Sequence, residues 1–218
     1  MSQPVAPVPP PVAPSRPPNF ARNAYHVANA VFVVLLVEWV LTTPALRVGV
    51  ATAGLVSAWG MEIARRADPR VNTLLMQVFA RVAHPHEARQ INSATWFTTA
   101  VFVMALFVPV SAGLAGLMVL GFGDPAAARI GRRFGRTPIG GGRTLEGSLG
   151  FVAVGAAAAW AGLVVFHADL PGAVAMATAA AVAGALGELG ARGVVDDNLT
   201  IPLCGSAAAW AVGAALGV

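Results

Sequence analysis

The stretch LGFVAVGAAAAWAGLVVFH, residues 149–167, contains no Asp, Glu, Lys or Arg. A helix needs about 20 consecutive, mostly apolar residues to span the hydrocarbon core of a bilayer. This stretch is apolar on all sides, whereas a helix in a water-soluble core is apolar on one face. The whole chain of 218 residues has the same character, since it is 56% hydrophobic and 11% charged, with a mean hydropathy of +0.69. The sequence therefore predicts an integral membrane protein.

Other apolar segments predict an all-α, polytopic membrane protein with about seven transmembrane helices. We expect these spans at about 25–43, 47–65, 92–108, 109–123, 149–167, 172–190 and 199–217. The segment 69–83 has one apolar stripe and is too short to span, so it predicts one interfacial helix. Residues 1–19 contain eight of the sixteen prolines, which predicts a disordered or polyproline II tail. The membrane-embedded domain is then 20–218.

The fourteen basic residues are all arginines, because the chain contains no lysine. This excludes a P-loop and the usual protein-kinase site, both of which place a lysine on the phosphates. It also excludes lysine Schiff-base chemistry.

The positions of the arginines predict the orientation of the chain. With seven spans and a cytoplasmic N-terminus, thirteen arginines lie on the cytoplasmic side and Arg47 lies outside. Positive residues are enriched on the cytoplasmic side of membrane proteins. We therefore expect a multi-pass protein with its N-terminus and polar loops in the cytoplasm and its C-terminus outside. Because topology explains the basic charge, we infer no nucleic-acid partner.

Three segments on the expected cytoplasmic side combine carboxylates, arginines and glycines. They are GDPAAARIGRRFG (123–135), PIGGGRTLEGS (138–148) and GELGARGVVDDNLTIP (187–202). Guanidinium and glycine N–H groups bind phosphate, and carboxylates hold divalent cations, so the combination indicates phosphoryl or nucleotidyl transfer. Simpler roles remain open: Asp124 and Asp197 could cap helices, and the arginines could anchor the chain at the membrane surface.

Further polar candidates fall on the same side. Glu62 and Arg65 are three residues apart, which fits an ion pair on one side of a helix. The remaining candidates lie within or beside the ends of apolar spans: Arg22, His26, Glu87, Glu188 and Asn198.

Several of these motifs, in their order along the chain, resemble the polyprenol kinase family, which includes dolichol kinase, the CTP-dependent diacylglycerol kinase of yeast type and phytol kinase. The shared elements are Gly-Asp, Gly-Arg-x-Phe-Gly, Thr-Leu-Glu-Gly-Ser and Asp-Asn-x-x-x-Pro. RNAYH (22–26) is similar to the family's Arg-Lys-x-x-His motif, and Glu62, Arg65 and Glu87 match its other polar positions. The chain departs from the pattern at Arg143 and Asn23, where the family usually has lysines.

The resemblance implies a lipid kinase domain that transfers the γ-phosphoryl group of CTP to an isoprenoid alcohol (polyprenol, dolichol or phytol type) or to diacylglycerol. It implies Mg²⁺ as cofactor, with Asp124, Glu146 and Asp197 as metal ligands and catalytic residues. The implied partners are CTP or ATP, the lipid alcohol and membrane lipids. The implied nucleotide and phosphate contacts are Gly123, Gly131, Arg132, Arg133, Gly135, Arg143, Thr144, Gly147 and Ser148.

Two other functions remain open on the sequence. The first is a CTP-dependent cytidylyltransferase acting on a phospholipid or isoprenoid phosphate, in which pyrophosphate leaves. The second is a non-enzymatic transporter or lipid-binding protein, which would suit Glu38 inside the first span. A transporter concentrates its polar groups near the midplane, whereas here they gather at one expected surface.

Overall fold

The computed structural model describes residues 20–81, 85–191 and 195–218, so the predicted tail 1–19 lies outside the described residues. The described chain is helical apart from one short β-hairpin. Its α-helices are α1 (Phe20–Leu35), α2 (Pro44–Ala67), α3 (Pro69–Val78), α4 (Ser93–Phe107), α5 (Val110–Met118), α6 (Asp124–Phe134), α7 (Leu145–Phe166), α8 (Ala173–Gly190) and α9 (Asp197–Leu216). Two π-helical turns, η1 (Leu36–Val40) and η3 (Val119–Gly123), and a 3₁₀ turn, η2 (Pro85–Ala88), connect some of them. The hairpin consists of β1 (Pro138–Gly140) and β2 (Arg143–Thr144), which pair antiparallel.

Five of the described helical segments are long and apolar enough to cross a membrane, which supports the predicted all-α membrane class. They are Phe20–Val40, Val110–Phe134, Leu145–Phe166, Ala173–Gly190 and Asp197–Leu216. α4 is apolar but shorter, and α2 has 24 residues but carries several charges in its last turns. The expected number of seven spans is therefore not confirmed.

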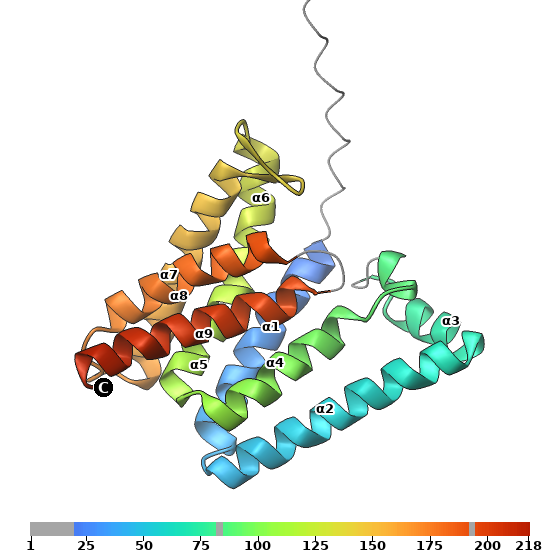
Figure 1. Cartoon of the computed structure of the whole chain (residues 1–218), viewed down its shortest axis with the longest axis horizontal. Helices are drawn as coiled ribbons and strands as arrows, with labels where there is room; N and C mark the ends of the chain where they lie inside the picture. Colours follow the sequence, from blue (N-terminus) through green and yellow to red (C-terminus); the bar gives the residue numbers. More distant parts are fainter. Residues whose placement is uncertain (1–19, 82–84, 192–194) are drawn as a thin grey trace, which may run out of the picture.

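α7, α8 and α9 pack side by side in this order, and α5 and η3 pack against them (Figure 1). Phe151, Leu163 and Ile201 are fully buried in this bundle. α1 lies against α5 and η3, whereas α2 runs along the outer edge and packs on α4 and α3. α3 occupies most of the predicted interfacial segment and exposes Leu74 and Val78, which are 59% and 66% accessible.

α5, η3 and α6 form one continuous helix of 25 residues, Val110–Phe134. Pro125 has no N–H and its ring would clash with the carbonyl four residues before it, and the wider π turn just before the proline relieves this conflict. Asp124 has helical torsions (φ −60°, ψ −50°) and therefore lies inside the helix. The alternative in which Asp124 caps a new helix is wrong.

Close contacts between glycines and neighbouring helices hold the bundle together, as is usual for membrane helices. A Cβ atom on Gly116 would lie 2.9 Å from Ser206 N of α9, with Ser206 Oγ and Pro202 O closer still. A Cβ atom on Gly113, one turn earlier on α5, would meet no atom within 4 Å.

We therefore expect Gly116→Ala to reduce the free energy of unfolding by about 2 kcal/mol, because α5 and α9 must separate. Gly113→Ala should leave it unchanged or raise it by up to about 1 kcal/mol, because alanine favours helix. Thermal unfolding of both variants in the same detergent tests the difference. Equal stabilities would show that α5 and α9 do not meet at Gly116.

Candidate functional site

Asp124 lies half-buried at one end of the bundle, among charged groups from several elements. It interacts electrostatically with Glu188 of α8, Arg22 of α1, Arg143 of β2 and Asp196, which precedes α9. Asp197, the first residue of α9, interacts with Asp124, Asp196 and Arg22. The structure therefore brings together five residues that the sequence singled out: Asp124, Asp197, Arg22, Arg143 and Glu188.

Arg143 and Glu188 form an ion pair beside Asp124. Arg143 Nε donates to Glu188 Oε1 at 2.9 Å, and the two side chains are 24% and 8% accessible. Glu188 Oε2 is the only buried side-chain N or O atom in the described part of the chain that has no hydrogen-bond partner. Buried polar atoms usually have a hydrogen-bond partner, so Glu188 Oε2 could accept a hydrogen bond from a ligand or contact a cation bound with it.

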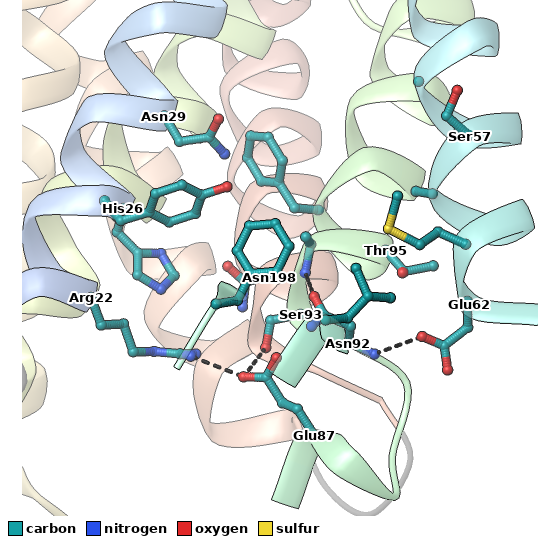
Figure 2. Close-up of a pocket in the computed structure, with 18 of the residues that line it drawn as sticks. Arg22, His26, Asn29, Ser57, Glu62, Glu87, Asn92, Ser93, Thr95 and Asn198 are labelled. Carbon is teal, nitrogen blue, oxygen red and sulfur yellow. Dashed lines mark hydrogen bonds and ion pairs between the residues drawn. The ribbon is translucent and has the colours of Figure 1, made fainter. Parts of the chain in front are cut away.

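A chain of polar contacts joins the starts of α1, α4 and α9. Figure 2 shows the part that runs from Arg22 through Glu87 to Ser93. Arg22 Nη1 donates to Glu87 Oε1 at 3.0 Å, and Ser93 Oγ lies 3.4 Å from the same oxygen. Ser93 Oγ also donates to Asp196 Oδ2 at 3.0 Å. Glu87 is 2% accessible, so its charge is balanced inside the protein rather than by water. These contacts bring η2 and three helix ends to one polar region.

Asp196, and not Asp197, caps α9. Its Oδ1 accepts from Asn198 N at 2.9 Å and from Asn198 Nδ2 at 2.6 Å, and its backbone is extended (φ −93°, ψ 150°). The alternative in which Asp197 serves only as the cap is wrong. Asp197 Oδ1 accepts one longer bond, 3.2 Å, from Asn198 Nδ2, so Asp197 retains further acceptor positions for a ligand.

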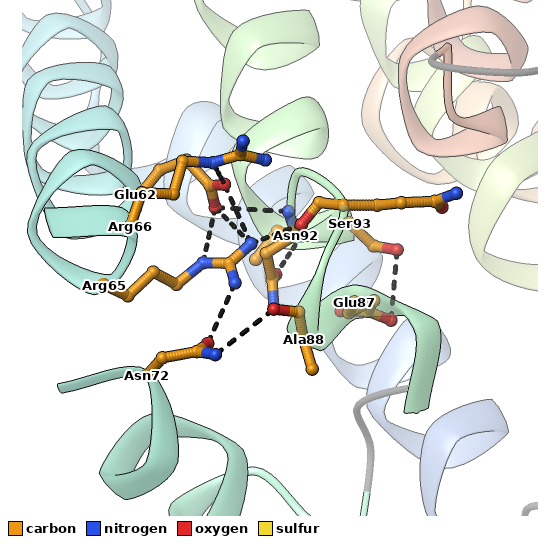
Figure 3. Close-up of polar contacts among 10 residues, drawn as sticks. Glu62, Arg65, Arg66, Asn72, Glu87, Ala88, Asn92 and Ser93 are labelled. Atoms are coloured by element: carbon orange, nitrogen blue, oxygen red, sulfur yellow. Dashed lines mark hydrogen bonds and ion pairs between the residues drawn. The ribbon is translucent and has the colours of Figure 1, made fainter. Parts of the chain in front are cut away.

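Glu62 and Arg65 belong to a separate cluster that joins α2, α3 and the segment before α4 (Figure 3). Arg65 binds Glu62 through two bonds of 2.8 Å, and it also donates to Asn72 Oδ1 at 3.1 Å and to Gln90 O. Glu62 also accepts from Arg66 Nε at 2.6 Å. These contacts pair the charges of Glu62 and Arg65 with each other. We therefore interpret the cluster as a structural link between α2, α3 and the segment before α4.

Glu146 lies apart from Asp124 and Asp197. Its Oε2 accepts from the backbone N of Arg136 and Thr137 at 3.1 and 3.2 Å, and its Oε1 accepts from Thr137 Oγ1 at 3.0 Å. These bonds tie the start of α7 to the segment that follows α6. The structure therefore places Glu146 in the support of the β-hairpin and does not bring it to the other predicted metal ligands.

The predicted phosphate-binding glycines lie at close contacts between α6 and α7. Cβ atoms on Gly131 and Gly147 would lie 3.1 and 3.2 Å from Thr144 Oγ1, and one on Gly135 would lie 2.8 Å from it. One on Gly123 would lie 3.1 Å from the ring of Phe151. Packing thus explains these four glycines without a ligand.

The remaining predicted phosphate contacts lie around the hairpin. Thr144 caps α7 by accepting from Gly147 N at 3.2 Å, and Ser148 lies in the first turn of that helix. Arg132 and Arg133 are exposed near the end of α6. At a rise of about 1.5 Å per residue, Arg132 lies about 12 Å along the helix axis from Asp124. Arg132 and Arg133 are therefore on the same helix as Asp124 but are not in direct contact with it.

A cavity of about 340 Å³ opens beside this polar region, with α1, α2, α4 and α9 among its walls. Arg22, His26, Glu62, Arg65, Glu87, Ser93 and Asn198 are among its polar lining residues. Figure 2 shows Arg22, Glu87, Ser93 and Asn198 grouped at one end of this space. Phe97 and Leu120 contribute to its apolar wall. The arrangement can hold a molecule that has one polar end and an apolar body.

The donor chemistry of Asp124 and Asp197 fits Mg²⁺, which prefers carboxylate oxygens. Within the described ranges, no three His, Cys, Asp or Glu side chains lie close enough to hold one metal ion together. Mg²⁺ usually takes only one or two protein carboxylates and completes its shell with water and substrate phosphates. Asp124 and Asp197 therefore suit an ion that arrives with a nucleotide, whereas Glu146 does not join them.

Sequence reasoning left Ser93 out of the candidate site and did not give Asp196 a role of its own. Ser93 bridges Glu87 and Asp196, and Asp196 both caps α9 and interacts with Asp124. The usable signal for Ser93 was its position at the start of an apolar segment on the arginine-rich side. For Asp196, the signal was the Asp-Asp-Asn run, in which the first residue is the natural cap.

We compared the chain with protein-family models, with curated proteins and with solved structures, and none of the three comparisons gave a match. The likeness to polyprenol kinases therefore rests on the motifs quoted above. The structure adds the electrostatic grouping of Asp124, Asp197, Glu188, Arg22 and Arg143. Of these residues, Arg22 also lines the cavity.

Proposed function

We propose that this protein is a CTP-dependent lipid kinase that transfers a γ-phosphoryl group to the hydroxyl of a membrane lipid alcohol. One observation carries the proposal: Asp124 lies among Asp197, Glu188, Arg22 and Arg143, and Arg22 also lines a cavity that offers apolar surface to a lipid. Phosphoryl transfer requires cation-binding acids, positive groups for the phosphates and a positioned acceptor. The polar region can supply the first two, and the cavity can position a lipid.

In this proposal Asp124 would hold Mg²⁺, which would neutralise phosphate charge when bound. Arg143 and Arg22 bind phosphate oxygens, and Arg132 and Arg133 contact the outer part of the nucleotide. The lipid hydroxyl oxygen attacks the γ-phosphorus while the bond from that phosphorus to the bridging oxygen breaks, so CDP leaves with the electron pair. Asp197 accepts the hydroxyl proton, since it keeps open acceptor positions.

The polar region faces the cytoplasm in this proposal. Arg22, Arg65 and Arg143 lie at this end through their contacts with Glu87, Gln90 and Glu188. Arg47 lies at the opposite end of α1 and α2, where its Nε donates to Leu41 O at 2.9 Å. Arginine enrichment marks the cytoplasmic side. α9 then takes the C-terminus to the other side.

The test incubates the purified protein, in sealed vesicles of known orientation, with lipid alcohols and either γ-labelled or α-labelled CTP. We expect label in the lipid from γ-labelled CTP alone, with CDP as the soluble product. CTP does not cross the bilayer, so transfer should occur only in vesicles that expose the Arg22 end of the protein.

The other outcomes each reject part of the proposal. Label from α-labelled CTP, with pyrophosphate released, would identify a cytidylyltransferase instead. Absence of transfer from either label, with lipid binding retained, would favour the non-enzymatic alternative. Transfer in vesicles of the opposite orientation would reject the cytoplasmic placement of the site.

A further inference from the structure

A second cavity, of about 260 Å³, continues the first one along α1 toward the opposite end of the helix. The two cavities share the lining residues Tyr25, Asn29, Gly54, Ala94 and Phe97. Because the two cavities share these walls, we infer that they act as one groove between α1, α2, α4 and α5, which we call the chain groove. Beyond Asn29 the wall is mainly apolar and includes Val33, Val34, Val101, Met104 and Leu117.

Polar groups lie at both ends of the chain groove. Arg22, His26 and Asn198 line the end beside Asp197, and Glu38 and Arg47 line the far end. Glu38 Oε1 lies 3.0 Å from His167 Nε2. Arg47 donates to Leu41 O at 2.9 Å and to Thr42 O at 3.1 Å. An apolar chain that passed beyond Glu38 and Arg47 would break the hydrogen bonds that these two side chains make with His167, Leu41 and Thr42.

The distance between these ends sets the length of chain that fits. Arg22 and Glu38 are sixteen residues apart on one continuous helical segment, Phe20–Val40. At a rise of about 1.5 Å per residue, the groove is about 24 Å long. An extended zigzag of C–C bonds of about 1.5 Å advances about 1.3 Å per bond, so about twenty main-chain carbons have this length. Each isoprene unit contributes four main-chain carbons and one methyl branch, so an isoprenoid of four or five units fits within the groove.

We propose that the chain groove holds the single hydrocarbon chain of a lipid alcohol of about twenty carbons, with its hydroxyl among Arg22, His26 and Asn198. This inference rests on the proposed function and narrows its substrate class to an isoprenoid alcohol of four or five units. A diacylglycerol has two chains, and in this proposal only one of them would lie in the groove. A long polyprenol would have to displace the polar groups at Glu38 and Arg47.

Gly54 offers a way to block the groove at its middle. It lies on α2, lines both cavities, and a Cβ atom there would meet nothing within 4 Å. Gly60 is a matched control, because it lies on the same helix with equally open space but is exposed and lines neither half of the chain groove. Both substitutions replace a helix glycine, so both should tend to favour helix.

The test measures binding of prenyl alcohols with ten, twenty and fifty-five carbons to the full chain in nanodiscs, without nucleotide. In the unchanged protein the twenty-carbon alcohol should bind most tightly. Gly54→Phe should weaken its binding about tenfold, because the distal part of the chain loses its packing contacts. The ten-carbon alcohol should bind equally to Gly54→Phe and to Gly60→Phe, which should itself behave like the unchanged protein.

A second measurement needs no variant. A twenty-carbon alcohol with a photoreactive group at its chain end should label the unchanged protein near Val37 and Leu41, and a ten-carbon one should label it near Asn29. Labelling spread over exposed outer positions such as Val165 and Leu186 would overturn the chain groove. Equal binding of the fifty-five-carbon alcohol would overturn the length limit. Because neither assay uses CTP, these results are independent of whether γ-phosphoryl transfer is observed.

Discussion

Asp124→Asn is expected to reduce γ-phosphoryl transfer to lipid by about a thousandfold, equivalent to roughly 4 kcal/mol in the barrier. A neutral amide is a poor ligand for Mg²⁺, and the substitution also removes the negative charge that interacts with Arg22 and Arg143. The measurement is the rate of label transfer from γ-labelled CTP at saturating lipid.

The fold should survive this substitution. Asparagine has nearly the same shape as aspartate, and Glu188 and Asp196 would lose a like-charged neighbour, so the thermal midpoint should stay the same or rise. Asp169→Asn makes the same chemical change in the exposed segment between α7 and α8 and should retain full activity. Full activity in Asp124→Asn would mean that Asp124 has no part in the reaction.

Arg143→Met should abolish activity and also lower stability. The substitution leaves Glu188, whose side chain is 8% accessible, as a buried charge without its partner. Breaking a buried pair in this way costs up to about 5 kcal/mol, and we expect about 2 kcal/mol because Arg143 is itself partly accessible. Arg143→Lys should retain part of both properties, because the positive charge remains while the guanidinium geometry is lost.

The double variant Arg143→Met with Glu188→Gln separates the two effects. It removes both charges, so most of the lost stability should return, whereas the phosphate contact that we assign to Arg143 stays absent and activity should not recover. Thermal unfolding and label transfer are measured on the single and double variants together. If activity recovered in the double variant, Arg143 would serve only to balance the charge of Glu188 and would not contact phosphate.

The sequence alone determined the membrane class, the approximate helix positions and the end of the bundle that carries the polar groups. The stretch 149–167 is apolar on all sides, and the structure has α7 over Leu145–Phe166. Such predictions succeed because the cost of placing a polar backbone or a charge in lipid is local and adds up residue by residue. The predicted number of seven spans was not confirmed, because α2 and α4 do not meet the criteria for a span. Charged residues weaken the apolar signal in α2, and α4 is too short.

Tertiary structure decided which of the polar residues meet. It places Asp124 inside one continuous helix after a π turn, gives the cap of α9 to Asp196, pairs Arg143 with Glu188 and keeps Glu146 with Thr137. It also shows that four glycines predicted to bind phosphate lie at close contacts where a side chain would not fit without a shift. These outcomes depend on how each helix is rotated about its axis. Helices rich in alanine and glycine, such as α7, α8 and α9, have no polar face from which that rotation could be read, and only close contacts with neighbouring helices determine it.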